Sequence, residues 1–256
     1  MQWWTLDPLL DRLIDLIADS QPGPSGETRV SPERELADKL GINRTSFREK
    51  MAVLEALGFI TRTQGSGTFL SIPRSNLHKY YYEVALRLGS ITIEQLQEAR
   101  EMLEMEMICA AVVNANEEDL KALEYFLNRM LGTADAEYGA DLDVAFHMAL
   151  GAATHNPVVM ILLEDLSFVL RRVYKERRLL VSRVLRGLAE TDATHLDILK
   201  AVREHEPVAA KAAMANHFSV WRDFAEKAGK VQKQQAGRSR GINYLASLPD
   251  VPDVHK

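Results

Sequence analysis

The chain has 256 residues but a single cysteine, Cys109. One thiol cannot form an intramolecular disulfide, and it excludes a metal site built from several thiolates. No apolar run approaches the roughly 18–20 residues that a membrane helix needs, and no secretory signal peptide is recognisable. We therefore expect a cytoplasmic protein that has no membrane partner.

Basic residues are in the minority, with 31 Lys and Arg against 36 Asp and Glu, giving a formal net charge of −5. This balance argues against a protein that coats nucleic acid without specificity. The deficit is not uniform, because residues 29–74 contain eight basic and five acidic side chains. A local basic surface is sufficient to bind phosphates.

Residues 30–56 have the pattern of two short helices joined by a turn. Ser31 is expected to cap a first helix beginning at Pro32, and Gly41 to end it. Asn43 is expected to cap the second helix, which carries several arginines. A further amphipathic helix is predicted over residues 6–19.

Residues 59–70 predict a β-hairpin that follows these helices. Two short runs of β-branched and aromatic residues flank the Gly-rich stretch 64–67. Helix, turn, helix and hairpin in this order are typical of a winged helix-turn-helix, whose second helix enters the major groove of DNA.

The expected DNA contacts lie on both helices and on the hairpin tip. An arginine can donate two hydrogen bonds to a guanine or bind a phosphate, and the sequence does not distinguish these roles. The alternative is a solvated basic helix face. The candidate DNA-binding residues are Arg34, Arg44, Thr45, Ser46, Arg48, Gln64, Gly65 and Gly67.

Four blocks in this region, SPERELA, LGINRTSFREKM, GFI and GSGTFL, resemble the signature of the GntR superfamily of bacterial transcription regulators. The family pattern reads PSERELA, LGVSRTTVREAL, GLI and GxGTFV. The departures are small: Lys50 replaces a small apolar residue, and Ser31-Pro32 inverts the usual order. The resemblance implies a regulator that binds double-stranded operator DNA.

The remainder of the chain reads as helix after an expected linker at 72–77. Thr92 and Gln95 form a plausible capping box. We predict a mainly α protein with three segments: a winged helix-turn-helix domain (1–75), an all-helical domain (76–230) and a polar tail (231–256). The predicted helices of the second domain are 92–115, 117–131, 139–152, 157–185, 190–204 and 207–228.

Four residues of the second domain have the chemistry of metal ligands. Asp143 and His147 are four residues apart and share a helix face, and His195 and His217 lie in later helices. Three imidazoles and one carboxylate suit zinc or another first-row divalent ion. On the residues alone the competing interpretation is ordinary core or surface histidines, because an isolated Asp-x-x-x-His pair is weak evidence.

A second family resemblance favours metal ligands over ordinary core or surface histidines. Residues 98–104, 143–150, 195–202 and 214–217 resemble the four blocks of the FCD effector domain found in FadR-like GntR regulators: ExRxxLE, DxxFHxxL, HxxIxxAI and MxxH. The resemblance implies a helical bundle that binds a divalent metal, with zinc expected first and nickel or manganese as alternatives. It also implies a homodimeric regulator, expected to be a repressor with a palindromic operator, and a small carboxylate effector that Arg100 contacts. The alternative for Arg100 is an exposed residue paired with Glu104.

Two other functions are alternatives for a chain with these residues. A metallohydrolase or non-haem oxygenase is disfavoured because the chain has no HExxH motif and no further carboxylate clearly placed as a general base. We therefore expect no enzymatic activity. The second alternative is a DNA-binding regulator whose metal is purely structural and which has no small-carboxylate effector.

Overall fold

The computed structural model describes residues 7–20, 28–71, 76–185 and 188–236. The chain divides into two compact units, residues 1–81 and 82–256, whereas we predicted a boundary at residue 75 from the sequence. Each unit has its own hydrophobic core.

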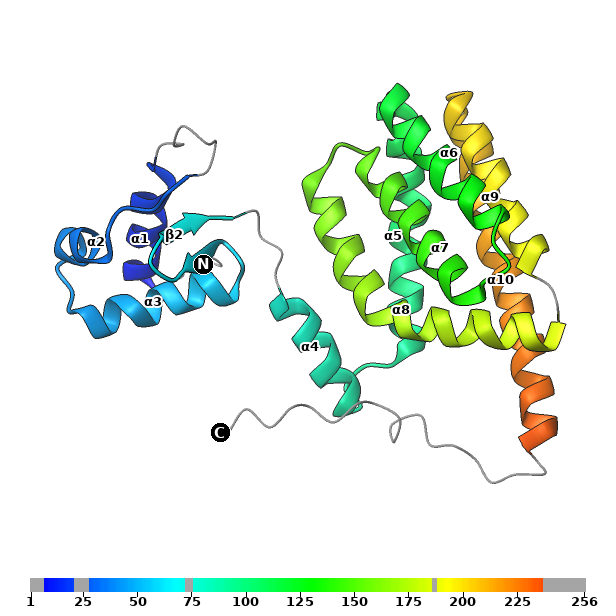
Figure 1. The fold of residues 1–256 in the computed structure, drawn as a ribbon, viewed down its shortest axis with the longest axis horizontal. Coiled ribbons are helices and arrows are strands. Elements are labelled where there is room, and N and C mark those ends of the chain that lie inside the picture. The colour runs from blue at the N-terminus through cyan, green and yellow to red at the C-terminus, as the bar shows by residue number, and fades with distance from the viewer. Residues whose placement is uncertain (1–6, 21–27, 72–75, 186–187, 237–256) are drawn as a thin grey trace, which may run out of the picture. The chain divides into compact units, whose positions relative to one another are not determined.

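The N-terminal unit contains α1 (Pro8–Ala18), α2 (Glu33–Leu40), α3 (Arg44–Ala56), β1 (Ile60–Thr63) and β2 (Gly67–Leu70) (Figure 1). The two strands pair antiparallel, with Ile60 opposite Leu70 and Thr63 opposite Gly67. The helices and β1 share one apolar core, as their spaced apolar residues predict. Its buried members are Leu10, Leu13, Ile17, Val30, Leu36, Ala37, Leu40, Phe47, Met51, Leu54 and Ile60.

The turn between α2 and α3 follows the predicted signals. Gly41 has a φ of 68°, a left-handed conformation that glycine adopts at little cost, and it ends α2. Asn43 caps α3, because its side-chain oxygen accepts a hydrogen bond of 2.9 Å from the amide of Ser46. These two residues set the direction in which α3 leaves the turn.

The predicted cap at Ser31 is wrong. Helix α2 begins at Glu33, and Pro32 occupies the cap position without a side-chain hydrogen bond. The preceding segment is held extended instead, since the amide of Val30 donates to the carbonyl of Thr68 at 2.9 Å. The β1–β2 hairpin, which we call the wing, therefore fixes the path of the chain that leads into α2.

The helices of the C-terminal unit follow the predicted order. The bounds of α6 and α8 match the predictions, and the capping box of Thr92 and Gln95 is confirmed at the start of α5. The helices after the wing are α4 (Asn76–Arg87), α5 (Ile93–Asn114), α6 (Glu117–Leu131), α7 (Ala136–Ala152), α8 (Pro157–Leu185), α9 (Leu188–Arg203) and α10 (Pro207–Ala236).

Beyond shifts of one or two residues at helix ends, three predicted segments differ from the structure. Helix α7 begins at Ala136, three residues before its predicted start at residue 139. Residues 76 and 77, expected in the linker, are the first of α4, and residues 72–75 lie outside the described residues. Helix α10 extends to Ala236, so it includes the first residues of the predicted polar tail. The rest of that tail, residues 237–256, lies outside the described residues.

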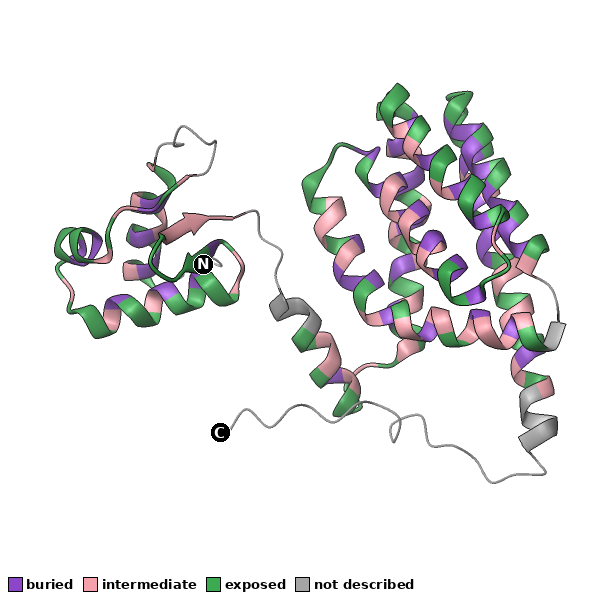
Figure 2. Ribbon diagram, viewed as in Figure 1, coloured by how far each residue is buried: buried purple, intermediate pink, exposed green. Residues whose placement is uncertain are grey.

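Helices α5 to α10 pack so that each places buried residues inward and exposed residues outward (Figure 2). The main core contains Phe146, Leu123, Leu127, Met130 and Met214, which are almost completely buried. Several charged and polar side chains are also buried in this bundle. Buried polar groups are costly unless they are paired, so their partners identify the candidate site.

Candidate functional site

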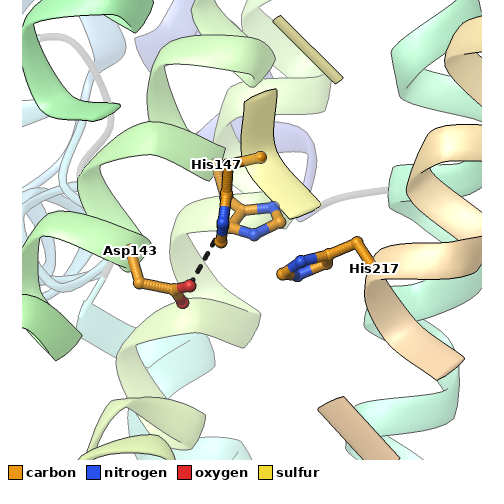
Figure 3. Close-up of side chains that lie close together, drawn as sticks. Asp143, His147 and His217 are labelled. Atoms are coloured by element: carbon orange, nitrogen blue, oxygen red, sulfur yellow. Dashed lines mark ion pairs between the residues drawn. The ribbon is translucent and has the colours of Figure 1, made fainter. Parts of the chain in front are cut away.

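The structure brings the four predicted metal ligands together. Asp143 and His147 lie one turn apart on α7, while His195 comes from α9 and His217 from α10. One ligand atom of each residue lies within 4.8 Å of those of the other three. Figure 3 shows Asp143, His147 and His217 directed toward a common centre. The three histidines are buried, and the Asp143 side chain is 22% exposed.

Each histidine makes a hydrogen bond through Nδ1. That of His147 faces the carboxylate of Glu104, and that of His195 lies 3.0 Å from the backbone carbonyl of Asp192. Because these oxygens only accept, both Nδ1 atoms carry a hydrogen.

Nδ1 of His217 also donates a hydrogen bond, in this case to the hydroxyl oxygen of Thr194. Thr194 donates its own hydrogen to the carbonyl of Thr191 at 2.6 Å, so its oxygen can accept from Nδ1 of His217 at 2.9 Å. With the hydrogen on Nδ1, each ring in its neutral form keeps a lone pair on Nε2, the form in which imidazole binds a metal.

The Nε2 atom of His195 shows why this cluster requires a cation. It lies 3.1 Å from Oδ1 of Asp143, yet it is buried and makes no hydrogen bond of acceptable geometry. Two facing acceptors need a proton or a metal ion between them. A divalent ion would satisfy Asp143 and all three Nε2 atoms together, so the residues fit a metal.

The electrostatics favour the metal-binding protonation states. Burial alone would raise the pKa of Asp143, but the adjacent His195 imidazole, together with His147 and His217, holds that pKa well below its ordinary range. Burial, aided by the charges of His195 and His147, holds the pKa of His217 well below its ordinary value. Asp143 is thus ionised and His217 neutral, as metal ligands must be.

Arg100 and Glu104 form a buried ion pair next to the cluster. Glu104 contacts both Arg100 and His147, and although burial would raise its pKa, Arg100 and His147 keep it below its ordinary value. The alternative prediction for Arg100 was an exposed residue paired with Glu104. The pairing is present, but Arg100 is only 3% exposed. Its Nη2 atom is buried without a hydrogen-bond partner, and its guanidinium lies 4.7 Å from the centre of the Tyr174 ring.

A cavity of about 690 Å³ connects these groups. Its buried lining includes Arg100, His147 and His217, and the aromatic side chains of Tyr174, Phe218 and Trp221 add apolar surface. The rest of the lining carries charges of both signs: Glu94, Glu98, Glu226 and Arg222 are exposed, and Glu101 and Arg177 are half-buried. The cavity is large enough for a small organic molecule.

The N-terminal unit presents the predicted DNA-binding residues on its surface. Arg34, Arg44, Thr45 and Arg48 are exposed, and Ser46 is half-buried at the start of α3. Arg48 makes an exposed ion pair of 3.4 Å with Glu33. Such exposed pairs are weak, so a phosphate group could replace Glu33 as the partner of Arg48.

The wing tip, residues 64–67, is exposed except at Gly67, which is half-buried. Gly65 and Gly67 have φ angles of 77° and 127°, so both require glycine for the turn. Gln64 is exposed beside them.

Several residues of the site were not predicted from the sequence. Arg29 is exposed and its guanidinium lies against Gly67 of the wing, next to a surface hollow that also includes Gln64. Its position just before the SPERELA block was the only sequence feature that pointed to it.

The hydrogen-bond partners of the histidines, Glu104, Asp192 and Thr194, could not be recognised from the sequence as residues of the metal site, because their roles depend on how the helices pack.

Comparison with known proteins places both units. Residues 25–70 match the profile of the gntR family of bacterial regulatory proteins, and residues 95–220 match the FCD domain. The uncharacterized HTH-type transcriptional regulator YcbG of Bacillus subtilis is 27% identical over 84% of this chain and 87% of its own length. LutR of the same organism is 29% identical over 72% of this chain and 85% of its own.

A solved GntR structure from Streptococcus agalactiae has a TM-score of 0.64 and 25% identity, covering 84% of this chain and 98% of that one. None of the helices described here is long and apolar enough to cross a membrane. The matched families and relatives are regulators and not enzymes. The chain therefore belongs to the GntR family of DNA-binding transcription regulators and carries an FCD effector domain.

Proposed function

We propose that this regulator is a homodimeric repressor that binds a palindromic operator and releases it when a small organic acid enters the cavity of the helical domain. The observation that carries this proposal is the joint placement of the Asp143, His147, His195 and His217 cluster and the buried guanidinium of Arg100 around one cavity. A metal site and an unsatisfied cationic donor together favour an anionic ligand.

Asp143, His147, His195 and His217 would hold the ion. Zinc is expected first, with nickel and manganese as alternatives, because imidazole and carboxylate ligands suit all three. The bound ion would supply an electron-pair acceptor for a carboxylate oxygen of the effector.

Arg100 would bind the same effector through Nη2. That atom is buried and has no partner among the described residues, so a carboxylate oxygen would satisfy it. Glu104 would keep Arg100 oriented and would hold His147 in the tautomer that exposes Nε2. Trp221 and Phe218 would exclude water from the effector body.

At the DNA, α3 would enter the major groove of each operator half-site. Arg44 and Arg48 would contact base edges or phosphates, helped by Arg34 on α2 and by Thr45 and Ser46. The wing tip, with Gln64, Gly65 and Gly67, would approach the backbone of the adjacent groove. A homodimer would match the two-fold symmetry of a palindrome.

Effector binding can act on DNA only if the effector has different affinities for the DNA-bound and released forms. The test is a titration of sugar acids, hydroxy acids and dicarboxylates against metal-loaded protein bound to its operator, selected beforehand from random duplex DNA. Release by a defined carboxylate supports the proposal. Full metal loading without release by any of these acids would favour the structural-metal alternative, and chemical turnover of the acid would favour an enzyme.

A further inference from the structure

A buried ion pair joins α8 to the turn of α9 that also carries His195. Arg178 of α8 donates two hydrogen bonds to the carboxylate of Asp192 on α9, at 2.7 and 2.6 Å. The two side chains are 4% and 6% exposed. Such a two-point pair fixes the relative orientation of its partners more strictly than a single hydrogen bond does.

The backbone of α7 closes against the same guanidinium. A methyl group added at Gly139 would lie 2.7 Å from Nη2 of Arg178, so glycine permits this close approach. Gly139 is one helical turn before Asp143. Arg178 therefore contacts both the helix that carries Asp143 and His147 and the helix that carries His195.

The single turn of α9 that Arg178 holds also orients two imidazoles. Its member Asp192 supplies the carbonyl that accepts from Nδ1 of His195, at 3.0 Å. Thr194, in the same turn, supplies the hydroxyl oxygen that accepts from Nδ1 of His217, at 2.9 Å. Thr191 completes the turn by accepting the Thr194 hydrogen, at 2.6 Å.

We infer that the turn Thr191–His195, anchored by Arg178, is the positioning element of the metal site: it fixes the rotation and tautomer of His195 and His217 before the ion arrives. Arg178 and Thr194 are positioning residues that do not touch the ion. This inference rests on the proposed metal site, because it assigns these residues a role toward it. Hydrogen-bond partners of ligating histidines typically change metal affinity by about 10- to 100-fold when removed.

The Thr194 variants give the sharpest comparison. Thr194→Val keeps the shape of the side chain but removes the oxygen that accepts from His217, whereas Thr194→Ser keeps the oxygen. In metal-free protein, nitrogen NMR of the histidine rings should show the Nδ1–H tautomer of His217 in the unaltered and Ser proteins and a loss of that preference in the Val protein. In competition with a chelating dye, Thr194→Val should bind Zn²⁺ about 10- to 100-fold more weakly, and Thr194→Ser should bind it nearly as well as the unaltered protein.

The ion pair is tested with both charges removed. Arg178→Met combined with Asp192→Ala leaves no unpaired buried charge, and such replacements often preserve folding. This double variant should weaken Zn²⁺ binding about as much as Thr194→Val does, and it should alter the visible spectrum of the Co²⁺-loaded protein. The matched control, Arg203→Met with Glu124→Ala, removes an exposed pair of 3.2 Å between α9 and α6, and it should leave both readouts unchanged.

The outcomes separate the two proposals. Unchanged Zn²⁺ affinity and an unchanged His217 tautomer in Thr194→Val would overturn the positioning role, even if the Arg178 variant fails to fold. If the unaltered protein binds no Zn²⁺, or if Asp143→Ala with His195→Ala binds it equally well, the proposed metal site itself is wrong. In that case the NMR comparison still decides whether Thr194 sets the tautomer.

Discussion

The Nε2 atom of His195 lies 3.1 Å from Oδ1 of Asp143, and neither atom carries a hydrogen when the ring is neutral. Nδ1 of His195 is already committed to the carbonyl of Asp192, at 3.0 Å. The contact is therefore stable only with a shared positive charge. His147 and His217 direct their ring nitrogens toward the same place, which is the physical basis for the predictions below.

Removing two of the four ligands should abolish metal binding. Asp143→Ala combined with His195→Ala leaves two imidazoles, fewer than the three protein ligands that even catalytic zinc sites use. Elemental analysis of purified protein should then find no bound divalent ion. The control is His155→Ala, which removes an exposed histidine paired with Asp119 and should keep the full metal content. Equal metal content in the ligand variant would place the ion elsewhere.

The stability of the metal-free bundle should depend on pH through His217. Its pKa lies well below the ordinary 6.5 because of burial and the nearby His195 and His147 charges. The unfolded chain therefore takes up this proton near pH 6.5, whereas the folded chain does not. The free energy of unfolding should fall as the pH drops below about 6.5 and level off once the pH is below the folded pKa.

Urea denaturation across this range, on protein stripped of metal, measures the effect. A His217→Phe variant should show a shallower loss of stability on acidification, and His155→Gln should behave like the unaltered protein. A loss of stability that is equally steep in His217→Phe would assign it to other groups.

The arginines at the start of α3 should carry operator affinity. Each bidentate contact between an arginine and a base contributes about 1–3 kcal/mol, so Arg44→Ala with Arg48→Ala should weaken operator binding by at least about 10-fold at fixed salt. If either contacts a phosphate instead, the salt dependence should also decrease, by about one unit of slope per contact. Fluorescence anisotropy with labelled operator measures both.

The control for this experiment changes the charge by the same amount. Lys121→Ala with Lys200→Ala removes two exposed basic residues of the helical domain. It should bind the operator as the unaltered protein does. An equal loss of affinity in both proteins would point to overall charge and not to α3.

Arg100 should matter for the effector more than for the metal. Arg100→Lys keeps a positive charge beside Glu104, so it avoids leaving a buried carboxylate unpaired, but it loses the planar donor group. Metal content should be unchanged, while the effector concentration needed for half-maximal operator release should rise about 10-fold, the equivalent of about 1.4 kcal/mol. An unchanged effector response would return Arg100 to a structural role with Glu104.

Local signals in the sequence predicted most of the fold. The bounds of α6 and α8 were predicted correctly. In the structure Asn116 caps α6 and Pro157 is the first residue of α8, and such caps and prolines act within a few residues. The end of α10 was missed because polar residues can continue a helix beyond the core that it packs against. Helix α4 was not among the individually predicted helices, and the predicted linker covered its first two residues, 76 and 77.

At the metal site, too, features within one helix could be predicted and contacts between helices could not. The spacing of Asp143 and His147 shows that they share a face, because it depends on one helix alone. The partners of the ligands depend on three-dimensional packing, so Glu104, Thr194 and Arg178 could not be assigned from the sequence. Their chemistry is ordinary for helix residues, and only the structure places them against the imidazoles.

We propose that a metal-dependent carboxylate signal controls DNA binding. The most direct measurement is operator affinity against carboxylate concentration, made in parallel on metal-loaded and metal-stripped protein at one salt concentration and pH. We expect at least one sugar acid, hydroxy acid or dicarboxylate to weaken operator binding by the loaded protein and to have little effect on the stripped protein. Equal responses of the two proteins, or no response to any of these acids, would contradict it.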